Sequence, residues 1–204
     1  MRIAGLYALT DARCCGPEGR ARVRAALAGG ARVLQVRCKD PRPTADAVRA
    51  LVSLGHAYGA PVIVNDDVGL AHEAGADGVH LGREDAALES ARAALGPSAI
   101  IGVSCYADLD RARDAVARGA DYLAFGSFYP SRTKPQAVRA DPSLLTAARA
   151  LGKPLVAIGG ILPENGRTLI AAGASALAVI DGIFGQDDIE GAARAYQQLF
   201  EETL

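Results

Sequence analysis

The stretch Gly59-Ala60-Pro61-Val62-Ile63-Val64-Asn65-Asp66-Asp67 shows the unit from which the whole chain is built. A Gly-Ala pair follows an alanine-rich helical stretch, a short apolar run comes next, and polar residues end the run. Glycine at this place fits the left-handed residue that closes many helices. The same order recurs after Gly30-Ala31, Gly75-Ala76, Gly119-Ala120 and Gly173-Ala174. Each unit therefore predicts a helix, a turn and a short strand.

The apolar runs are short and do not alternate strictly, which is typical of parallel strands covered on both faces. We expect strands near 5–10, 33–36, 61–64, 79–81, 99–104, 122–125, 154–160 and 177–180. Helices are expected between them, near 18–29, 43–58, 67–75, 86–95, 107–118, 142–151, 163–172 and 187–202. Eight units in 204 residues leave about 25 residues each, enough for a strand, a helix and two short loops.

An open dinucleotide-binding sheet is the structural rival, and it would carry G-x-G-x-x-G after the first strand. The chain contains no G-x-G, and no linker or shift in composition marks a second domain. We therefore predict an α/β fold, a single (β/α)8 TIM barrel of the phosphate-binding type that covers residues 1–204.

The charge balance excludes several partners. Lys and Arg number 22 and Asp and Glu 23, which gives no electrostatic basis for binding nucleic acid or an anionic membrane. No signal peptide or spanning apolar run is visible, so we expect a cytoplasmic protein with small-molecule partners. The oligomeric state stays open. Four cysteines lack metal-binding spacing and are expected to be reduced thiols without a catalytic role: Cys14, Cys15, Cys38 and Cys105.

Polar residues gather where the predicted strands end, which is where TIM barrels place their active sites. These strand ends are Gln35 to Lys39, Asn65 to Asp67, Gly82 to Asp85, Ser104, Ser127 to Lys134, Gly159-Gly160, and Ile180 to Gly182. One polar strand end is common, but so many in register predict a site.

Two of these ends carry carboxylates that suggest a metal. Asp66 and Asp85 should close adjacent parallel strands, about 5 Å apart. Two carboxylates at that distance repel unless a cation lies between them, and Mg²⁺ binds one or two carboxylates together with substrate phosphate oxygens. The alternative for each is a helix N-cap; Asp67 suits that role.

Gly159-Gly160 and Ile180-Asp181-Gly182 follow the last two strands, where many barrels bind a phosphate through backbone N–H groups. The alternative is that these glycines only form tight turns. Ser131-Arg132-Thr133-Lys134 adds hydroxyls and cations nearby, or forms a solvated loop. His80 lies within an apolar run and is interpreted as a core residue.

Together these motifs resemble the thiamine-phosphate synthase family over nearly the whole chain. The similar segments are Gly5 to Asp11, Gln35-x-Arg37-x-Lys39, Val64 to Asp67, Ala76 to Gly82, Phe125 to Lys134, Ala157 to Ile161, and Ala178 to Ile180. Each segment is weak alone; their order and their placement at strand ends make the joint resemblance strong.

The resemblance implies roles for particular residues. Asp66 and Asp85 would hold Mg²⁺, and a pyrimidine diphosphate would be surrounded by Gln35, Arg37, Lys39, Asn65, Ser104 and Lys134. Arg37, Ser104 and Lys134 would act in catalysis. The phosphate of a thiazole would be bound by Ser131, Arg132, Thr133, Gly160, Ile180 and Asp181. Asp181 stands where many members have serine, so we expect its backbone N–H to bind rather than its carboxylate.

The implied activity is that of a transferase. It joins 4-amino-2-methyl-5-(diphosphomethyl)pyrimidine to a thiazole phosphate, carboxylated or not, by a dissociative substitution assisted by Mg²⁺. Two alternatives remain: a thiazole tautomerase and a non-catalytic regulator that binds thiazole phosphate. A tautomerase would not need Asp66, Asp85 and the cations at Arg37 and Lys39.

Overall fold

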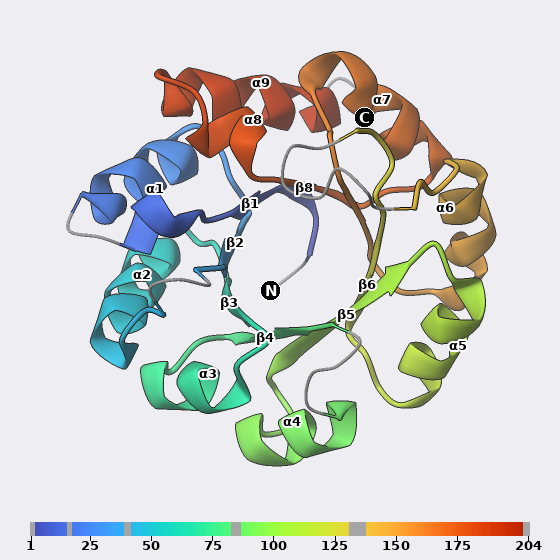
Figure 1. The fold of residues 1–204 in the computed structure, drawn as a ribbon, viewed down its shortest axis with the longest axis horizontal. Coiled ribbons are helices and arrows are strands. Elements are labelled where there is room, and N and C mark those ends of the chain that lie inside the picture. The colour runs from blue at the N-terminus through green and yellow to red at the C-terminus, as the bar shows by residue number, and fades with distance from the viewer. Residues whose placement is uncertain (1–2, 16–17, 39–41, 83–86, 131–137, 202–204) are drawn as a thin grey trace.

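The computed structural model describes residues 3–15, 18–38, 42–82, 87–130 and 138–201, and these form a closed parallel barrel surrounded by helices (Figure 1). The strands are β1 Gly5–Leu9, β2 Val33–Val36, β3 Val62–Asn65, β4 Gly78–Leu81, β5 Ile100–Tyr106, β6 Tyr122–Phe125, β7 Leu155–Ile158 and β8 Ala176–Val179. They pair in sequence order, and β8 closes on β1. The predicted (β/α)8 barrel is confirmed.

The outer ring consists of α1 Gly19–Ala28, α2 Ala45–Ala57, α3 Val68–Ala74, α4 Leu88–Leu95, α5 Leu109–Ala117, α6 Ser143–Ala148, α7 Pro163–Ala172 and α9 Ile189–Glu201. Each lies within the range expected from the sequence. The predicted helix at 142–151 ends as a separate 3₁₀ turn, Arg149–Leu151. Two short elements were not predicted: the 3₁₀ turn Ala12–Cys15 after β1, and α8 Asp181–Phe184 after β8.

The recurring Gly-Ala pair forms the turn between helix and strand that the sequence predicted. The glycines of the five units have positive φ, namely Gly30, Gly59, Gly75, Gly119 and Gly173. An acidic residue after two of these pairs fastens the next strand. Asp77 accepts the amide of Val62 at 2.7 Å, and Asp121 accepts that of Ile101 at 2.7 Å. These side chains hold the strand starts in register, so the strand ends on the opposite rim are aligned.

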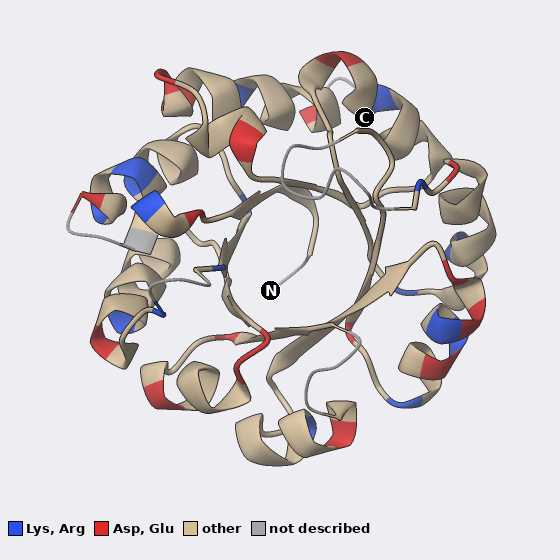
Figure 2. Cartoon of the chain, in the orientation of Figure 1, with Lys and Arg blue, Asp and Glu red and all other residues tan. Residues whose placement is uncertain are grey.

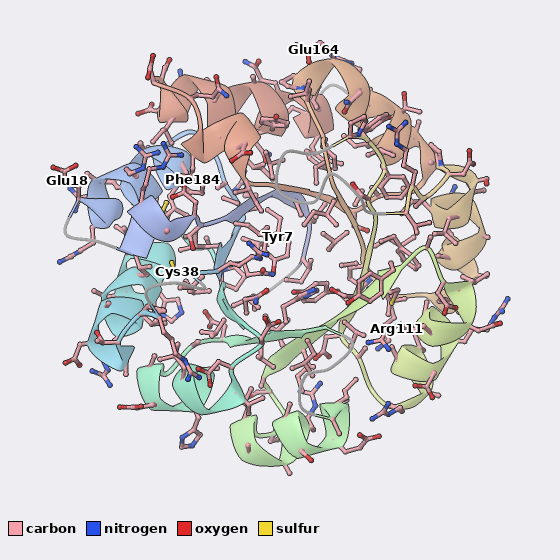
Figure 3. The ribbon with its side chains drawn as sticks, viewed as in Figure 1. Tyr7, Glu18, Cys38, Arg111, Glu164 and Phe184 are labelled. Carbon is pink, nitrogen blue, oxygen red and sulfur yellow. The ribbon has the colours of Figure 1, made fainter. Side chains whose placement is uncertain are left out.

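Two apolar layers result from the alternation of side chains along each strand. Leu6 and Ala8 of β1 face the helices and join the larger core, whereas Tyr7 and Leu9 point into the barrel. Figure 3 shows Tyr7 inside the ring of strands. Gly102 of β5 makes room for Tyr122, because a Cβ atom there would lie 1.9 Å from the phenol ring. The charged residues lie mainly on the helices and loops outside this interior (Figure 2).

Candidate functional site

All eight strands are parallel, so their carboxyl ends share one rim of the barrel. This rim brings together Gln35 of β2, Asn65 of β3 and Ser104 of β5, as the sequence predicted. Of the other residues assigned to the site, Lys39, Asp85, Ser131, Arg132, Thr133 and Lys134 lie outside the described residues.

Gln35 points into the barrel and is 3% exposed. Its side-chain Nε2 donates to the Tyr7 hydroxyl at 2.9 Å. Two residues on, the backbone N–H of Arg37 donates to Thr10 Oγ1 at 2.8 Å. This bond ties the loop after β2 to the end of β1 and fixes the backbone from which the Arg37 side chain extends.

Cys38 departs from the expectation for the cysteines. It is disulfide-bonded, whereas Cys14 and Cys105 are free. Its sulfur also lies 3.4 Å from the carbonyl oxygen of Asp11. The prediction that all four cysteines are reduced is therefore wrong for Cys38. The sequence shows no spacing motif that would have indicated this bond.

Asp66 follows β3 with a φ of 65°, a left-handed conformation that side chains other than glycine seldom adopt. Its backbone N–H donates to the carbonyl oxygen of His80 on β4 at 2.8 Å. Asp67 instead caps α3, since its Oδ1 accepts the amide of Leu70 at 3.0 Å. The adjacent carboxylates thus differ in role, and the predicted N-cap at Asp67 is confirmed. Backbone strain of this kind gathers at functional sites.

The described residues alone do not complete a metal site, because no group of three or more His, Cys, Asp or Glu side chains among them could hold an ion. Asp66 supplies one carboxylate at the rim, and Mg²⁺ needs only one or two when substrate phosphate oxygens are also present. The pairing of β3 with β4 places the end of β4 beside Asp66. The residues at this rim are therefore compatible with a magnesium ion shared with a phosphate ligand.

His80 is buried in β4, as its apolar surroundings predicted, and both ring nitrogens have partners. Nδ1 lies 2.9 Å from the Tyr122 hydroxyl, and Nε2 lies 2.9 Å from Ser104 Oγ. The Tyr122 hydroxyl is in turn 2.8 Å from that of Tyr7. A continuous hydrogen-bonded chain thus crosses the barrel from Gln35 to Ser104. The sequence analysis assigned its two ends to the site and missed its three inner members.

Arg111 of α5 holds the rim from outside. Its Nε donates to the carbonyl oxygen of Ser104 at 2.7 Å, and one terminal nitrogen donates to that of Gly82 at 2.9 Å. One guanidinium thus joins the ends of β4 and β5; Figure 3 labels Arg111 near α5.

Gly159 and Gly160, after β7, pack closely against the segment that follows β6. A Cβ atom on Gly160 would lie 2.2 Å from the carbonyl oxygen of Pro130. The amide of Tyr129 donates to the Gly159 carbonyl at 2.9 Å, and that of Ala140 donates to Ser127 at 2.8 Å. Tyr129 and Pro130 therefore lie beside this glycine turn.

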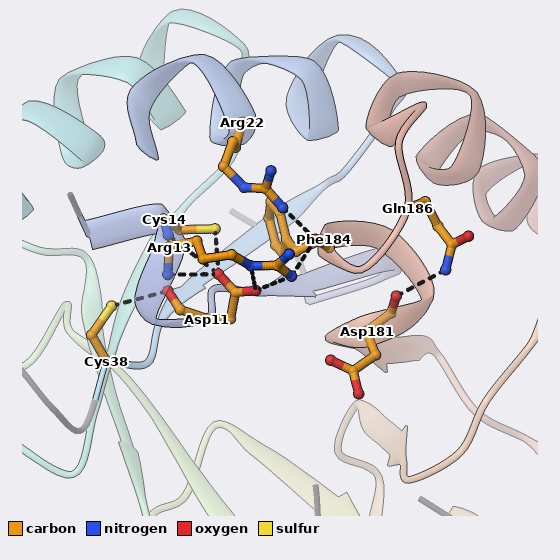
Figure 4. A network of polar contacts seen from close by, with 8 residues as sticks. All are labelled: Asp11, Arg13, Cys14, Arg22, Cys38, Asp181, Phe184 and Gln186. Atoms are coloured by element: carbon orange, nitrogen blue, oxygen red, sulfur yellow. Dashed lines mark hydrogen bonds and ion pairs between the residues drawn. The ribbon is translucent and has the colours of Figure 1, made fainter. Parts of the chain in front are cut away.

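After β8, Ile180 is the N-cap residue of α8 and Asp181 begins that helix. Arg13 and Arg22 both donate to the carbonyl oxygen of Phe184 at its other end. Arg13 is itself held by Asp11, with nitrogen–oxygen distances of 2.8 and 2.6 Å. Figure 4 shows this network, with Asp181 at the far end of the helix. Two arginines thus anchor the turn that includes Ile180 and Asp181.

A hollow at the opposite rim is lined by Ile3, Asp77, Ile100, Asp121 and Pro154, among others. Both of its carboxylates already accept strand amides, and they also bond to the side chains of His56 and Arg92. The chemistry-bearing residues lie at the other end of the barrel. Within the described part of the chain, no helix is long and apolar enough to cross a membrane.

Comparison with known proteins agrees with this geometry. A sequence model of a family described as thiamine monophosphate synthase matches residues 6–183. The chain is 51% identical over 205 residues to a thiamine-phosphate synthase of Acidithiobacillus ferrooxidans, covering 97% of this chain and 94% of that one. It is 50% identical over 199 residues to that of Thiobacillus denitrificans, covering 96% and 94%. A solved thiamine phosphate pyrophosphorylase from Pyrococcus furiosus superposes with a TM-score of 0.86 at 35% identity, covering 98% and 96%.

Proposed function

The chain belongs to the thiamine monophosphate synthase family, and from that premise we propose how its rim carries out the synthesis of thiamine phosphate. The substrates are 4-amino-2-methyl-5-(diphosphomethyl)pyrimidine and a thiazole phosphate, and the second product is diphosphate. The observation that carries the proposal is the convergence of Gln35, Asn65, Asp66 and Ser104 on one rim, beside the anchored turns at Gly160 and Ile180.

The pyrimidine diphosphate binds over β2 to β5. Gln35 and Ser104 contact the aminopyrimidine from the barrel interior, and Arg37 and Asn65 contact the diphosphate. Lys39 and Lys134, which lie outside the described residues, add cations to the leaving group. Removing one group that stabilises such developing charge typically slows a reaction about 10²–10³-fold.

The thiazole phosphate binds over β7 and β8. Backbone N–H groups near Gly160, Ile180 and Asp181 receive its phosphate, together with Ser131, Arg132 and Thr133. Supporting this assignment, Arg13 and Arg22 fix the far end of α8, so the turn before it is held before any ligand binds. Only the N–H of Asp181 is assigned to the phosphate, because a carboxylate directed at a phosphate would repel it.

Asp66 and Asp85 hold Mg²⁺ jointly with diphosphate oxygens. When bound, the ion supplies positive charge that stabilises the departing diphosphate. Asp66 suits this role because it directly follows β3 at the rim, whereas the neighbouring Asp67 caps α3.

The chemistry is a loose substitution at the methylene carbon of the pyrimidine. The bond to the diphosphate oxygen breaks, its electrons leave with the diphosphate, and the ring nitrogen of the thiazole forms the new carbon–nitrogen bond. The residues of the rim orient the two substrates and exclude water from the cationic carbon. A carboxylated thiazole substrate would in addition lose CO₂.

The test is to mix both substrates with Mg²⁺ and follow thiamine phosphate and diphosphate together. Equal amounts of the two products are expected, with none when either substrate is omitted. A tautomerase would alter the thiazole phosphate alone, and a binding regulator would alter neither substrate. Either of those results would refute the proposal.

A further inference from the structure

The buried chain of hydrogen bonds from Gln35 to Ser104 has a direction that follows from counting protons. Gln35 Nε2 is a donor, so the Tyr7 oxygen accepts from it at 2.9 Å. The only other described partner of the Tyr7 hydroxyl is the Tyr122 hydroxyl, 2.8 Å away. Tyr7 must therefore donate its single proton to Tyr122, because the reverse arrangement would leave that proton without an acceptor.

The same count fixes the second half of the chain. Tyr122 accepts from Tyr7, so its own proton goes to His80 Nδ1, 2.9 Å away. A histidine that accepts at Nδ1 carries its proton on Nε2. That nitrogen lies 2.9 Å from Ser104 Oγ and donates to it. Ser104 Oγ accepts this bond, so its own hydroxyl proton is available to a group that is not part of this row of hydrogen bonds.

The inner members are well placed to keep this direction. Tyr7 and Tyr122 are 1% and 0% exposed. Their rings meet edge to face with centroids 6.0 Å apart, and the His80 ring stacks on Tyr122 at 5.6 Å. Burial raises the pKa of both phenols above its ordinary value, so both hydroxyls keep their protons. Because these hydroxyls are buried, water has little access to replace their hydrogen-bond partners.

We propose that Tyr7, Tyr122 and His80 are positioning residues that make Ser104 a hydrogen-bond donor, and the Gln35 carbonyl an acceptor, toward the pyrimidine. This inference rests on the proposed function. A 4-aminopyrimidine offers an amino donor next to a ring-nitrogen acceptor, which is the complement of that pair. The 4-hydroxy analogue, in its oxo form, offers the opposite pattern. This hydrogen-bonded network therefore selects the amino substrate. The 4-hydroxy analogue would leave buried polar groups without hydrogen-bond partners, which makes its binding free energy less favourable.

The direction is read without substrate from the ¹⁵N shifts of His80 in an NMR spectrum at pH 8. The chain contains 3 histidines, so a His80→Gln spectrum assigns the signal. We expect the Nε2–H tautomer in the wild type. In Gln35→Glu the carboxylate cannot donate to Tyr7, so the whole chain should reverse and His80 should become the Nδ1–H tautomer. An Nδ1–H wild type, or a Gln35→Glu variant that keeps Nε2–H, would overturn the inference.

Selectivity tests the functional part. Tyr122→Phe interrupts the chain, and Tyr196→Phe is its matched control because Tyr196 is equally buried and donates to Ile161 at 2.9 Å, outside the chain. The ratio of kcat/KM for the 4-amino over the 4-hydroxy diphosphate should fall roughly tenfold in Tyr122→Phe and stay unchanged in Tyr196→Phe. Equal ratios in both variants would refute the positioning role. If the wild type formed no thiamine phosphate, the proposed function would fail, while the tautomer would still decide the direction.

Discussion

Arg111 binds the backbone of Ser104, with its Nε donating to the Ser104 carbonyl oxygen at 2.7 Å. The same guanidinium binds the Gly82 carbonyl at 2.9 Å. Gly82 ends the described part of the loop after β4, and Ser104 is one end of the hydrogen-bonded chain that crosses the barrel. A side chain on an outer helix therefore holds two strand ends in the part of the rim to which we assign the pyrimidine diphosphate.

Arg111→Met should raise the KM for the pyrimidine diphosphate and lower kcat, because both carbonyls lose a charged donor and the strand ends loosen. The free energy of unfolding should fall by about 1–3 kcal/mol. Arg113→Met on the same helix is the control, since Arg113 pairs with the exposed Asp110 and such pairs contribute at most ~1 kcal/mol. Steady-state kinetics and urea unfolding check both variants. Equal kinetics for the two would show that Arg111 has no positioning role.

Asp181→Ser should preserve turnover and leave the affinity for thiazole phosphate equal or higher, because only the backbone N–H at this position is assigned to the ligand. Asp181 is the first residue of α8 and not its N-cap, and the start of α8 has no side-chain cap, so the substitution removes no capping bond. Calorimetric titration with the thiazole phosphate measures the affinity. A sharp loss at unchanged stability would mean that the carboxylate itself binds.

Alkaline pH should destabilise the protein through its buried thiols. Burial raises the pKa of Cys14 and of Cys105 from 9.0 to about 12. Above pH 9 the unfolded chain loses these protons while the folded protein keeps them. Stability is therefore complete below pH 9 and is lost as the pH rises toward 12, with each thiol approaching ~1.4 kcal/mol per pH unit.

From pH 9 to 10 the thiols contribute most of the loss, because the ordinary pKa of the buried tyrosines, 10.0, is higher and their unfolded forms lose fewer protons in this interval. Urea unfolding of the wild type across this interval should show a falling free energy. The double variant Cys14→Ala, Cys105→Ala should show a clearly shallower fall, whatever its absolute stability, with the remainder due to the buried tyrosines. If the free energy of unfolding fell equally steeply with pH in the wild type and the double variant, the two thiols would not be the cause.

Much of the fold follows from local pattern. The runs at 33–36 and 122–125 coincide with β2 and β6, and the expected helices all form. The Gly-Ala turn and the apolar run that follows it both indicate where a helix ends and the next strand begins, so these boundaries could be predicted. The short α8 was missed because its four residues carry no periodicity.

Site residues could be predicted only where the local sequence at the end of one strand indicates them. Gln35, Asn65 and Ser104 reach the rim as expected, and Asp67 caps its helix. The partners of His80 were not predictable, since Tyr122 and Ser104 lie 42 and 24 residues away and meet it only when the barrel closes.

The central claim is that Asp66 binds an ion together with the diphosphate, so metal and diphosphate should bind with positive linkage. Asp66→Asn should remove most of this linkage and slow turnover, while thiazole phosphate still binds over β7 and β8. Asp67→Asn is the matched control, because it makes the same change at the next residue and asparagine still caps α3.

The decisive measurement is a calorimetric titration of the wild type, Asp66→Asn and Asp67→Asn with diphosphate, each with and without Mg²⁺. The account predicts that Mg²⁺ tightens diphosphate binding about tenfold or more in the wild type and in Asp67→Asn, and hardly at all in Asp66→Asn. Equal affinity with and without Mg²⁺ in the wild type, or full linkage in Asp66→Asn, would contradict it.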